Sequence, residues 1–196
     1  MKEVLDKYIT YYKQLVPEAT PKELSFMCEG ACIKTYPKKS FFLKAGEVQP
    51  AMGFVYEGLL RRYYINEKGN TITTGFIPEN NYAADYPAFI KQKASKYFIE
   101  CLEASVLVEL PYNKIQESYQ KFQNTERYGR LIAEYVLTLQ TNRTESFLFE
   151  NAEERYLNFI AENQNLMHRI SLTHLSSYLG IERQSLSRIR KKLTRE

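Results

Sequence analysis

The segment 171–193 constrains the fold of this 196-residue chain more than any other stretch of its sequence. Two amphipathic runs each place three apolar residues on one helical face: Leu172, Leu175 and Leu179, then Leu186, Ile189 and Leu193. Gly180 lies between them, where a helix needs a left-handed C-terminal cap, and Ser176 is small enough for a close helix crossing. Two short helices joined by a tight glycine turn, the second of them basic, predict a helix-turn-helix.

The polar face of the second run has side chains that suit DNA. Arg183, Gln184 and Arg188 point away from the predicted core. Arg can bond guanine in a bidentate manner and Gln can bond adenine in the same way, so these three are predicted to contact bases. A basic amphipathic helix of no special function is the alternative for a lone basic run, but the complete two-helix pattern favours double-stranded DNA as the partner.

Positive charge is concentrated in the same part of the chain. From Arg169 onward seven Lys and Arg residues stand against two Glu residues, a net charge of +5. Residues 1–168 hold 20 basic and 21 acidic residues, a net charge of −1. This asymmetry is typical of a small domain that contacts phosphates.

The first half of the chain has the pattern of a β protein. Five of the eight glycines in the whole chain lie between positions 46 and 75. Short β-rich runs separated by turns are expected at 41–43, 53–56, 59–65, 71–74, 97–102 and 106–110. Many short strands at this spacing predict a small barrel or roll.

Two sets of residues resemble the Crp/Fnr family, the cyclic-AMP receptor protein-like bacterial transcription regulators. Residues 178–181 and 183–189 are similar to that family's helix-turn-helix, while Lys44-Ala45-Gly46-Glu47 and 55–59 are similar to its cyclic-nucleotide-binding β-roll. The resemblance implies an α+β fold with a sensor β-roll and flanking helices (1–124), a dimerisation helix (125–149) and a helix-turn-helix domain (150–196). It also implies a cytoplasmic regulator, without enzymatic activity, that binds a palindromic operator as a homodimer.

In that family the positions of Arg183, Gln184 and Arg188 contact bases in the major groove. Gln184 replaces a more usual acidic residue, so a different base preference is expected there. Glu182 takes the place of a Ser or Thr N-cap, and the wing hairpin that follows in the family is expected to be missing or truncated here. RNA polymerase is a further candidate partner. Six side chains are expected to contact the DNA backbone: Thr173, His174, Ser185, Ser187, Lys191 and Lys192.

The segment 125–149 has one apolar stripe that extends over about three helical turns: Tyr128, Leu131, Ile132, Tyr135, Val136 and Leu139. The resemblance implies that Leu131, Tyr135 and Leu139 pair with their twins across a two-fold axis. The alternative is a helix that packs on its own β-roll. After it, residues 151–160 with the N-cap candidate Asn151 resemble the first helix of the family's DNA-binding domain.

The candidate effector pocket departs from the family pattern. Relatives that bind cyclic nucleotides use a Gly-Glu pair for the ribose and an Arg followed by Ser or Thr for the phosphate. Here Ala84 and Asp85 take the place of the Gly-Glu pair, Ser95 aligns with the phosphate clamp, and no Arg occurs from 63 to 126. Lys93 or Lys96 is the remaining source of charge, as a mobile point charge. Tyr82, Asp85, Ser95 and Lys96 are the candidate pocket for an unknown small-molecule effector, and no cyclic nucleotide is expected.

Other chemistries have little support. Cys28 and Cys32 could share a helix face, but an iron–sulfur cluster usually takes four thiolates, and with Cys101 there are only three. They are expected to be reduced and mostly buried, with no cofactor or metal. A cupin-like metal protein lacks ligands, because both histidines, 168 and 174, lie outside the roll. The competing possibility is a small-molecule-binding β-roll module without specific DNA binding. No signal peptide or membrane helix is predicted.

Overall fold

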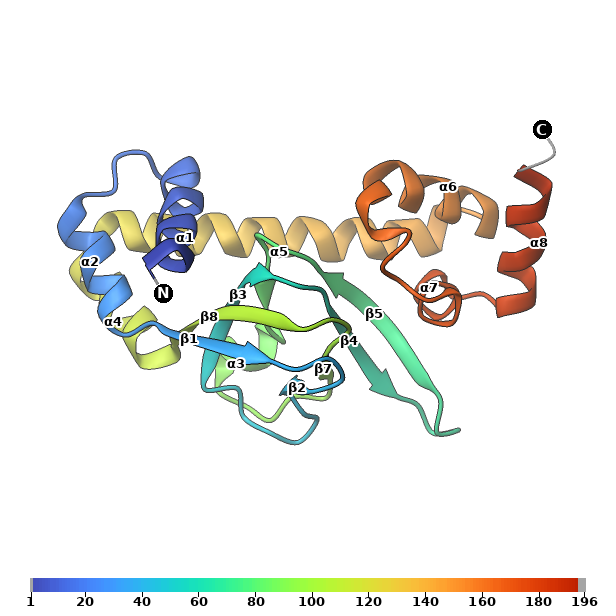
Figure 1. Ribbon diagram of the computed structural model, residues 1–196, viewed down its shortest axis with the longest axis horizontal. Helices are drawn as coiled ribbons and strands as arrows, with labels where there is room; N and C mark the ends of the chain where they lie inside the picture. The colour runs from blue at the N-terminus through green and yellow to red at the C-terminus, as the bar shows by residue number, and fades with distance from the viewer. Residues whose placement is uncertain (1, 194–196) are drawn as a thin grey trace. The chain divides into compact units, whose positions relative to one another are not determined.

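The structure is a computed structural model that describes residues 2–193. Its helices are α1 (Lys2–Leu15), α2 (Pro21–Glu29), α3 (Tyr86–Lys91), α4 (Tyr112–Lys121), α5 (Gln123–Phe149), α6 (Ala152–Glu162), the 3-10 turn η1 (Gln164–Leu166), α7 (Leu172–Leu179) and α8 (Arg183–Leu193) (Figure 1). Its strands are β1 (Cys32–Tyr36), β2 (Phe41–Leu43), β3 (Ala51–Glu57), β4 (Leu60–Ile65), β5 (Thr71–Ile77), β6 (Tyr82–Ala83), β7 (Phe98–Cys101) and β8 (Ser105–Pro111). The expected α+β fold and each of the six expected β runs are confirmed.

The chain divides into two compact units. The first contains the chain up to Arg62 and Phe76–Leu137, and the second contains Tyr63–Gly75 and the chain from Thr138 onward. The long helix α5 therefore contributes its first half to one unit and its second half to the other.

The strands form two four-stranded sheets, in the orders β1-β8-β3-β6 and β2-β7-β4-β5. In the first sheet β8 pairs antiparallel with both β1 and β3, and Phe54 lies opposite Val108. A core between the sheets takes residues from both, because successive side chains of a strand face opposite sides. Its buried members are Leu43, Val55, Leu60, Ile77, Ala83, Ile99, Cys101 and Leu107.

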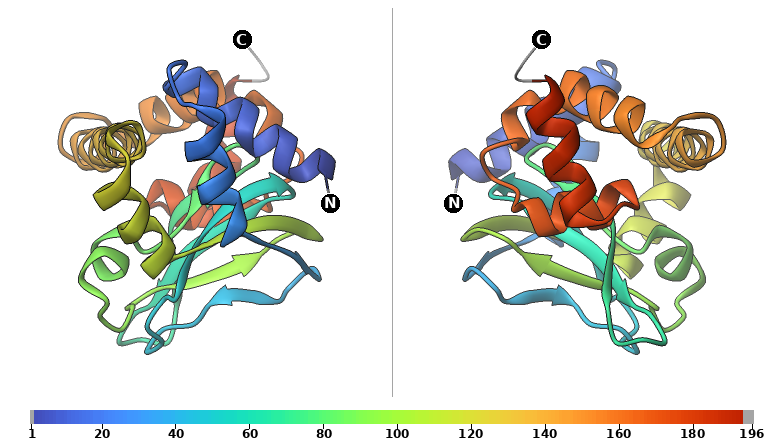
Figure 2. Two further views of the ribbon diagram at one scale, coloured as in Figure 1. Left: turned by 90° about the vertical axis from the view of Figure 1, so that its left-hand side faces the viewer. Right: turned by 90° about the vertical axis from the view of Figure 1, so that its right-hand side faces the viewer.

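Helices α1, α2, α4 and the first half of α5 build a second core on the other face of the first sheet (Figure 2, left). Tyrosines dominate it. The rings of Tyr12 and Tyr128 stack at 3.8 Å, and the hydroxyl groups of Tyr128 and Tyr82 are 2.5 Å apart. Tyr128 and Ile132 of α5 are thus buried in their own unit. This part of the stripe therefore packs within its own unit, and Leu131, Tyr135 and Leu139 stay a prediction for the dimer contact.

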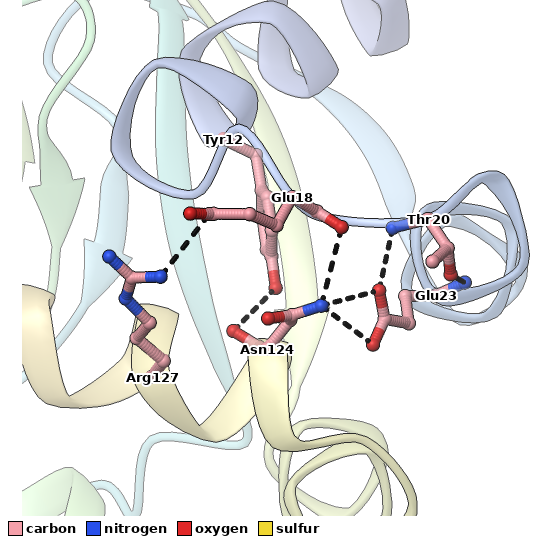
Figure 3. A network of polar contacts seen from close by, with 6 residues as sticks. All are labelled: Tyr12, Glu18, Thr20, Glu23, Asn124 and Arg127. Atoms are coloured by element: carbon pink, nitrogen blue, oxygen red, sulfur yellow. Dashed lines mark hydrogen bonds and ion pairs between the residues drawn. The ribbon is translucent and has the colours of Figure 1, made fainter.

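A polar network fixes the start of α5 beneath the α1–α2 connection (Figure 3). The Asn124 amide donates to both carboxylate oxygens of Glu23, at 3.2 and 3.1 Å, and Arg127 pairs with Glu18 at 3.2 Å. Glu23 also accepts a hydrogen bond of 2.6 Å from the Thr20 N–H, which completes the capping box of α2. Burial by itself raises the pKa of Glu23, but these donors outweigh it and the net shift is downward.

In the second unit α7 packs against α6 and α8 (Figure 2, right). The apolar residues buried in these helices are Tyr156, Phe159, Leu175, Leu179 and Leu186. Asn151 caps α6 through a capping box with Glu154, as the sequence predicts. Gly180 adopts φ 68°, the left-handed cap that a tight turn between α7 and α8 requires. Leu186 in the first turn of α8 is fully buried, and Ser176 of α7 is buried as well.

The prediction for the cysteines is partly wrong. Helix α2 ends at Glu29 and Cys32 begins strand β1, so Cys28 and Cys32 share no helix face. All three thiols are unpaired in the described chain, but only Cys101 is buried, Cys28 is half-buried and Cys32 is exposed. Only Ala31 separates Gly30 from Cys32, and the run Cys32–Tyr36 contains β-branched and aromatic residues that favour a strand.

Candidate nucleic-acid interface and effector pocket

The outer face of α8 carries the predicted base contacts. Arg183, Gln184 and Arg188 are all exposed, while Leu186, on the side of the helix opposite Gln184 and Arg188, is 0% exposed. Arg188 donates a hydrogen bond of 3.3 Å to the hydroxyl of Ser185, one turn earlier. The apolar side of α8 packs against the rest of the unit, so the three polar side chains extend into solvent. Side chains of this kind can reach base edges when such a helix lies in a major groove.

The six predicted backbone contacts lie on α7 and α8. Thr173, Ser187, Lys191 and Lys192 are exposed, and His174 and Ser185 are half-buried. Lys192 pairs with both carboxylate oxygens of Glu153 on α6, at 2.8 and 3.0 Å. A phosphate must therefore compete with a carboxylate for Lys192.

Helix α7 is fixed at both ends. The Ser171 hydroxyl accepts the His174 N–H at 3.1 Å as an N-cap. At the C-terminal end, Arg143 donates to the carbonyl of Tyr178, and Arg155 donates to the carbonyl of Leu179 at 3.0 Å. The sequence reasoning missed all three residues. The Ser before the first apolar residue was an available signal for the cap, whereas contacts between α5, α6 and α7 leave no local pattern.

In the roll, Asp85 and Ser95 are brought together. Asp85 is 5% and Ser95 is 4% exposed, and the Ser95 hydroxyl donates to the Asp85 carboxylate at 2.8 Å. The backbone N–H of Asp85 donates to the side chain of Gln49 at 3.0 Å, and Gln49 donates in turn to the carbonyls of Ala51 and Ala83 at 2.7 and 3.2 Å. Asp85, Ser95 and Gln49, here named the Asp85 cluster, therefore satisfy one another's polar groups. The sequence reasoning missed Gln49.

The other two pocket candidates lie apart from this cluster. Tyr82 joins the tyrosine core through its contact with Tyr128, and Lys96 is exposed. Within residues 2–193 no ion pair involves Asp85. Two arginines of β4, Arg61 and Arg62, come just before the arginine-free stretch, and Arg61 pairs with Glu100 at 2.9 Å. A cyclic phosphate needs a fixed cationic donor, so these residues do not fit a cyclic nucleotide.

The predicted dimer residues differ in their surroundings along α5. Leu131 is partly buried against the core of the first unit. Tyr135 is 48% exposed and donates to the Asn81 side chain at 3.2 Å, and Leu139 is 47% exposed. Leu137 is 67% exposed beside them. The apolar surface that α5 leaves uncovered thus begins at Tyr135.

The described part of the chain has neither a membrane-spanning helix nor a metal-binding cluster. No helix within residues 2–193 is long and apolar enough to cross a bilayer. The same residues contain no group of three or more His, Cys, Asp or Glu side chains arranged to hold a metal ion.

Comparison with known proteins gives consistent matches. The cyclic nucleotide-binding domain family matches residues 33–122. Electron transport regulator A of Shewanella oneidensis is 26% identical over 173 residues, and the fumarate and nitrate reduction regulatory protein of Yersinia pestis is 25% identical over 178 residues. Each alignment covers 80% of this chain, and the chain spans 66% of the length of each of these relatives.

Solved structures share the fold. FixK2 from Bradyrhizobium japonicum aligns with a TM-score of 0.75 at 15% identity, over 84% of each chain. A transcriptional regulator of the Crp/Fnr family from Eubacterium rectale aligns with a TM-score of 0.72 at 14% identity, over 93% of this chain and 87% of that one. Both curated relatives are regulators by name, in agreement with the expectation that the chain is not an enzyme. In its matched domain, its curated relatives and its fold, the chain is similar to transcription regulators of the Crp/Fnr family.

Proposed function

We propose that this chain is a transcription regulator of the Crp/Fnr type that binds a palindromic DNA operator as a homodimer and contacts bases through Arg183, Gln184 and Arg188. The observation that carries the proposal is that these three side chains of α8 are exposed, while Leu186 of the same helix is fully buried. Arg and Gln are the side chains that pair with guanine and adenine in a major groove. The net charge of +5 from Arg169 onward supplies attraction to phosphates.

The dimer is proposed to form along α5, beyond the part that packs on its own unit. Tyr135 and Leu139 are half-exposed, and a symmetric partner helix would cover them. Leu139→Glu should split the dimer, because it buries two unpaired carboxylates near the two-fold axis. Light scattering at micromolar concentration measures this directly. A monomeric unmodified protein would contradict the dimer and the palindrome together.

The proposed domains are a sensor roll (1–124), a dimerisation helix (125–149) and a DNA-binding domain (150–196). The protein is proposed to act in the cytoplasm. The roll is proposed to respond to an effector other than a cyclic nucleotide, or to have lost its effector, because the Asp85 cluster is closed by its own hydrogen bonds. RNA polymerase is the further partner that such a regulator would contact.

Selection of bound sequences from random DNA, followed by gel shift at moderate salt, tests the proposal. A two-fold symmetric sequence with half-sites about 34–36 Å apart is expected. Binding without sequence preference would favour a nonspecific DNA protein, and no binding would favour a small-molecule-binding β-roll module.

A further inference from the structure

The guanidinium group of Arg143 lies between two aromatic rings near the end of α5. It is 3.8 Å from the ring centre of Tyr178 and 4.3 Å from that of Phe147. It also donates to the backbone carbonyl of Tyr178. Burial lowers the pKa of Arg143, and the neighbouring Arg155 lowers it further. No ion pair with a carboxylate is formed by Arg143 in residues 2–193, so stacking and a backbone carbonyl hold this side chain.

Arg155 of α6 approaches the same place from another side. Its Nε–H donates to the Leu179 carbonyl at 3.0 Å, and its Nη1–H donates to the Glu150 carbonyl at 2.6 Å. The last carbonyls of a helix have no partner within the helix and form its negative end. Two guanidinium groups, one from α5 and one from α6, therefore cap the C-terminus of α7.

The ring of Phe147 extends this contact to the turn of the helix-turn-helix. A Cβ atom built on Gly180 would lie 2.6 Å from Phe147, so the turn and the ring are in direct contact. The four residues Arg143, Phe147, Arg155 and Tyr178 are named the Arg143 clamp. All of them lie in the second unit, within which α7, the turn and the last turns of α5 are joined.

We propose that Arg143 is a positioning residue that sets the spacing between the two half-sites of the operator. The inference rests on the proposed function. In a dimer built along α5, the separation of the two α8 helices depends on the angle between α5 and each helix-turn-helix. A planar guanidinium stacked between two rings and bonded to a helix end fixes that angle, which a flexible ammonium group does not do. Arg143 acts through α7 and makes no contact with bases itself.

Binding of spaced operators by the full chain tests this. The operator selected by the unmodified protein is compared with versions that have one or two base pairs inserted or deleted between the half-sites. Arg143→Ala should weaken binding at the native spacing by about 3- to 30-fold, the range expected for a residue that couples two parts of a protein. It should also reduce the penalty for wrong spacing to about threefold or less, because each half can then reorient.

Two readouts separate positioning from a loss of charge or of folding. Base preference within a half-site and the salt dependence of binding should stay unchanged, because no base or phosphate contact is removed. Arg143→Lys keeps the charge and should keep the fold, judged by thermal melting, yet it should lose the spacing preference as Arg143→Ala does. Arg130→Ala is the matched control: Arg130 is an exposed arginine of the same helix, paired with Glu134 at 2.6 Å, and its loss should leave the spacing preference intact.

The outcomes distinguish this inference from the proposed function. If the unmodified protein selects no two-fold symmetric sequence, the proposed function fails before any variant is made. If it does select one, and Arg143→Ala and Arg143→Lys keep the full penalty for wrong spacing, the positioning role is wrong and the DNA-binding function stands.

Discussion

The outer face of α8 and the Asp85 cluster both contain polar residues that the sequence singles out, but the polar groups of α8 face solvent and those of the cluster are buried and bonded to one another. On α8 the side chains of Arg183, Gln184 and Arg188 are exposed, with their hydrogen-bonding capacity directed outward. In the roll, the carboxylate of Asp85 is 5% exposed and already bonded to the Ser95 hydroxyl.

This difference indicates that the outer face of α8, and not the Asp85 cluster, can bind a partner without breaking existing hydrogen bonds. Binding a ligand at the Asp85 cluster would require existing buried hydrogen bonds to be broken, and each buried group left unpaired costs about 1–3 kcal/mol. Binding DNA on α8 displaces only water and counterions. The family resemblance alone assigns a ligand to both regions, whereas the contacts favour only α8.

The largest expected effect tests α8. Replacing Arg183 or Arg188 by Ala should cost about 1–3 kcal/mol on the selected operator, and the double variant about 2–6 kcal/mol if the two add. Gel-shift titration on the operator and on random DNA measures the loss. An equal loss of affinity for both DNAs would exclude base contacts by these arginines. The outer face of α8 would then no longer differ from the Asp85 cluster as a specific binding surface.

The Asp85 cluster should respond in stability instead. Asp85→Ala removes the hydrogen bond of 2.8 Å that the Ser95 hydroxyl donates, and the Tyr97 carbonyl at 3.2 Å remains as its other acceptor. The free energy of unfolding should therefore fall by about 0.5–1.5 kcal/mol, the usual net contribution of one hydrogen bond. The exposed Lys96→Ala is the control and should change it by less than about 0.5 kcal/mol. Urea denaturation measures both variants.

Calorimetry with cyclic AMP and cyclic GMP tests the same cluster for ligand binding. No binding tighter than about 1 mM, or about −4 kcal/mol, is expected from the unmodified protein. Micromolar binding that disappears in Lys96→Ala would overturn this and return a nucleotide-sensing role to the roll.

The sequence was sufficient for elements with local signals. The apolar spacing from Leu172 to Leu193, with Gly180 between the two runs, predicted α7, the turn and α8, because periodicity and turn chemistry act over a few residues. The stripe of α5 was harder to interpret. Its apolar residues form one series in the sequence, yet Ile132 is buried in its own unit and Leu139 is half-exposed. The apolar periodicity predicts which face of the helix is buried. It does not predict whether each turn of that face is covered by the same chain or by a partner.

Long-range polar contacts were beyond sequence reasoning. Gln49 and Asp85 are 36 positions apart, and Arg143 and Tyr178 are 35 apart, so no local spacing connects them. Cys32 shows a different limit. The distance to Cys28 suited a helix, but Glu29 ends α2 and the chain turns into β1. A boundary between elements cannot be located from spacing alone.

A smaller effect is expected from acid. The pKa of Glu23 is lowered from its ordinary value of 4.5 by the donors around it, so the charged form is favoured by folding. Its contribution to stability is complete above pH 4.5 and is lost as the pH falls through the lowered value. Glu23→Gln should therefore flatten the fall in unfolding free energy on acidification. Thermal melts between pH 6 and pH 3 measure it, and an unchanged pH dependence would contradict the assignment.

The smallest expected effect distinguishes two neighbouring lysines on α8. Lys191→Ala should reduce the salt dependence of DNA binding by about 0.9 in log–log slope, the value for one phosphate contact. Lys192 is engaged by Glu153 at 2.8 Å, so Lys192→Ala should reduce the slope by less. An exposed ion pair contributes about 0–1 kcal/mol, so Glu153→Gln should strengthen binding to all DNA by about fivefold at most. Equal slopes for the two lysine variants, with no gain from Glu153→Gln, would mean that the carboxylate does not compete with phosphate.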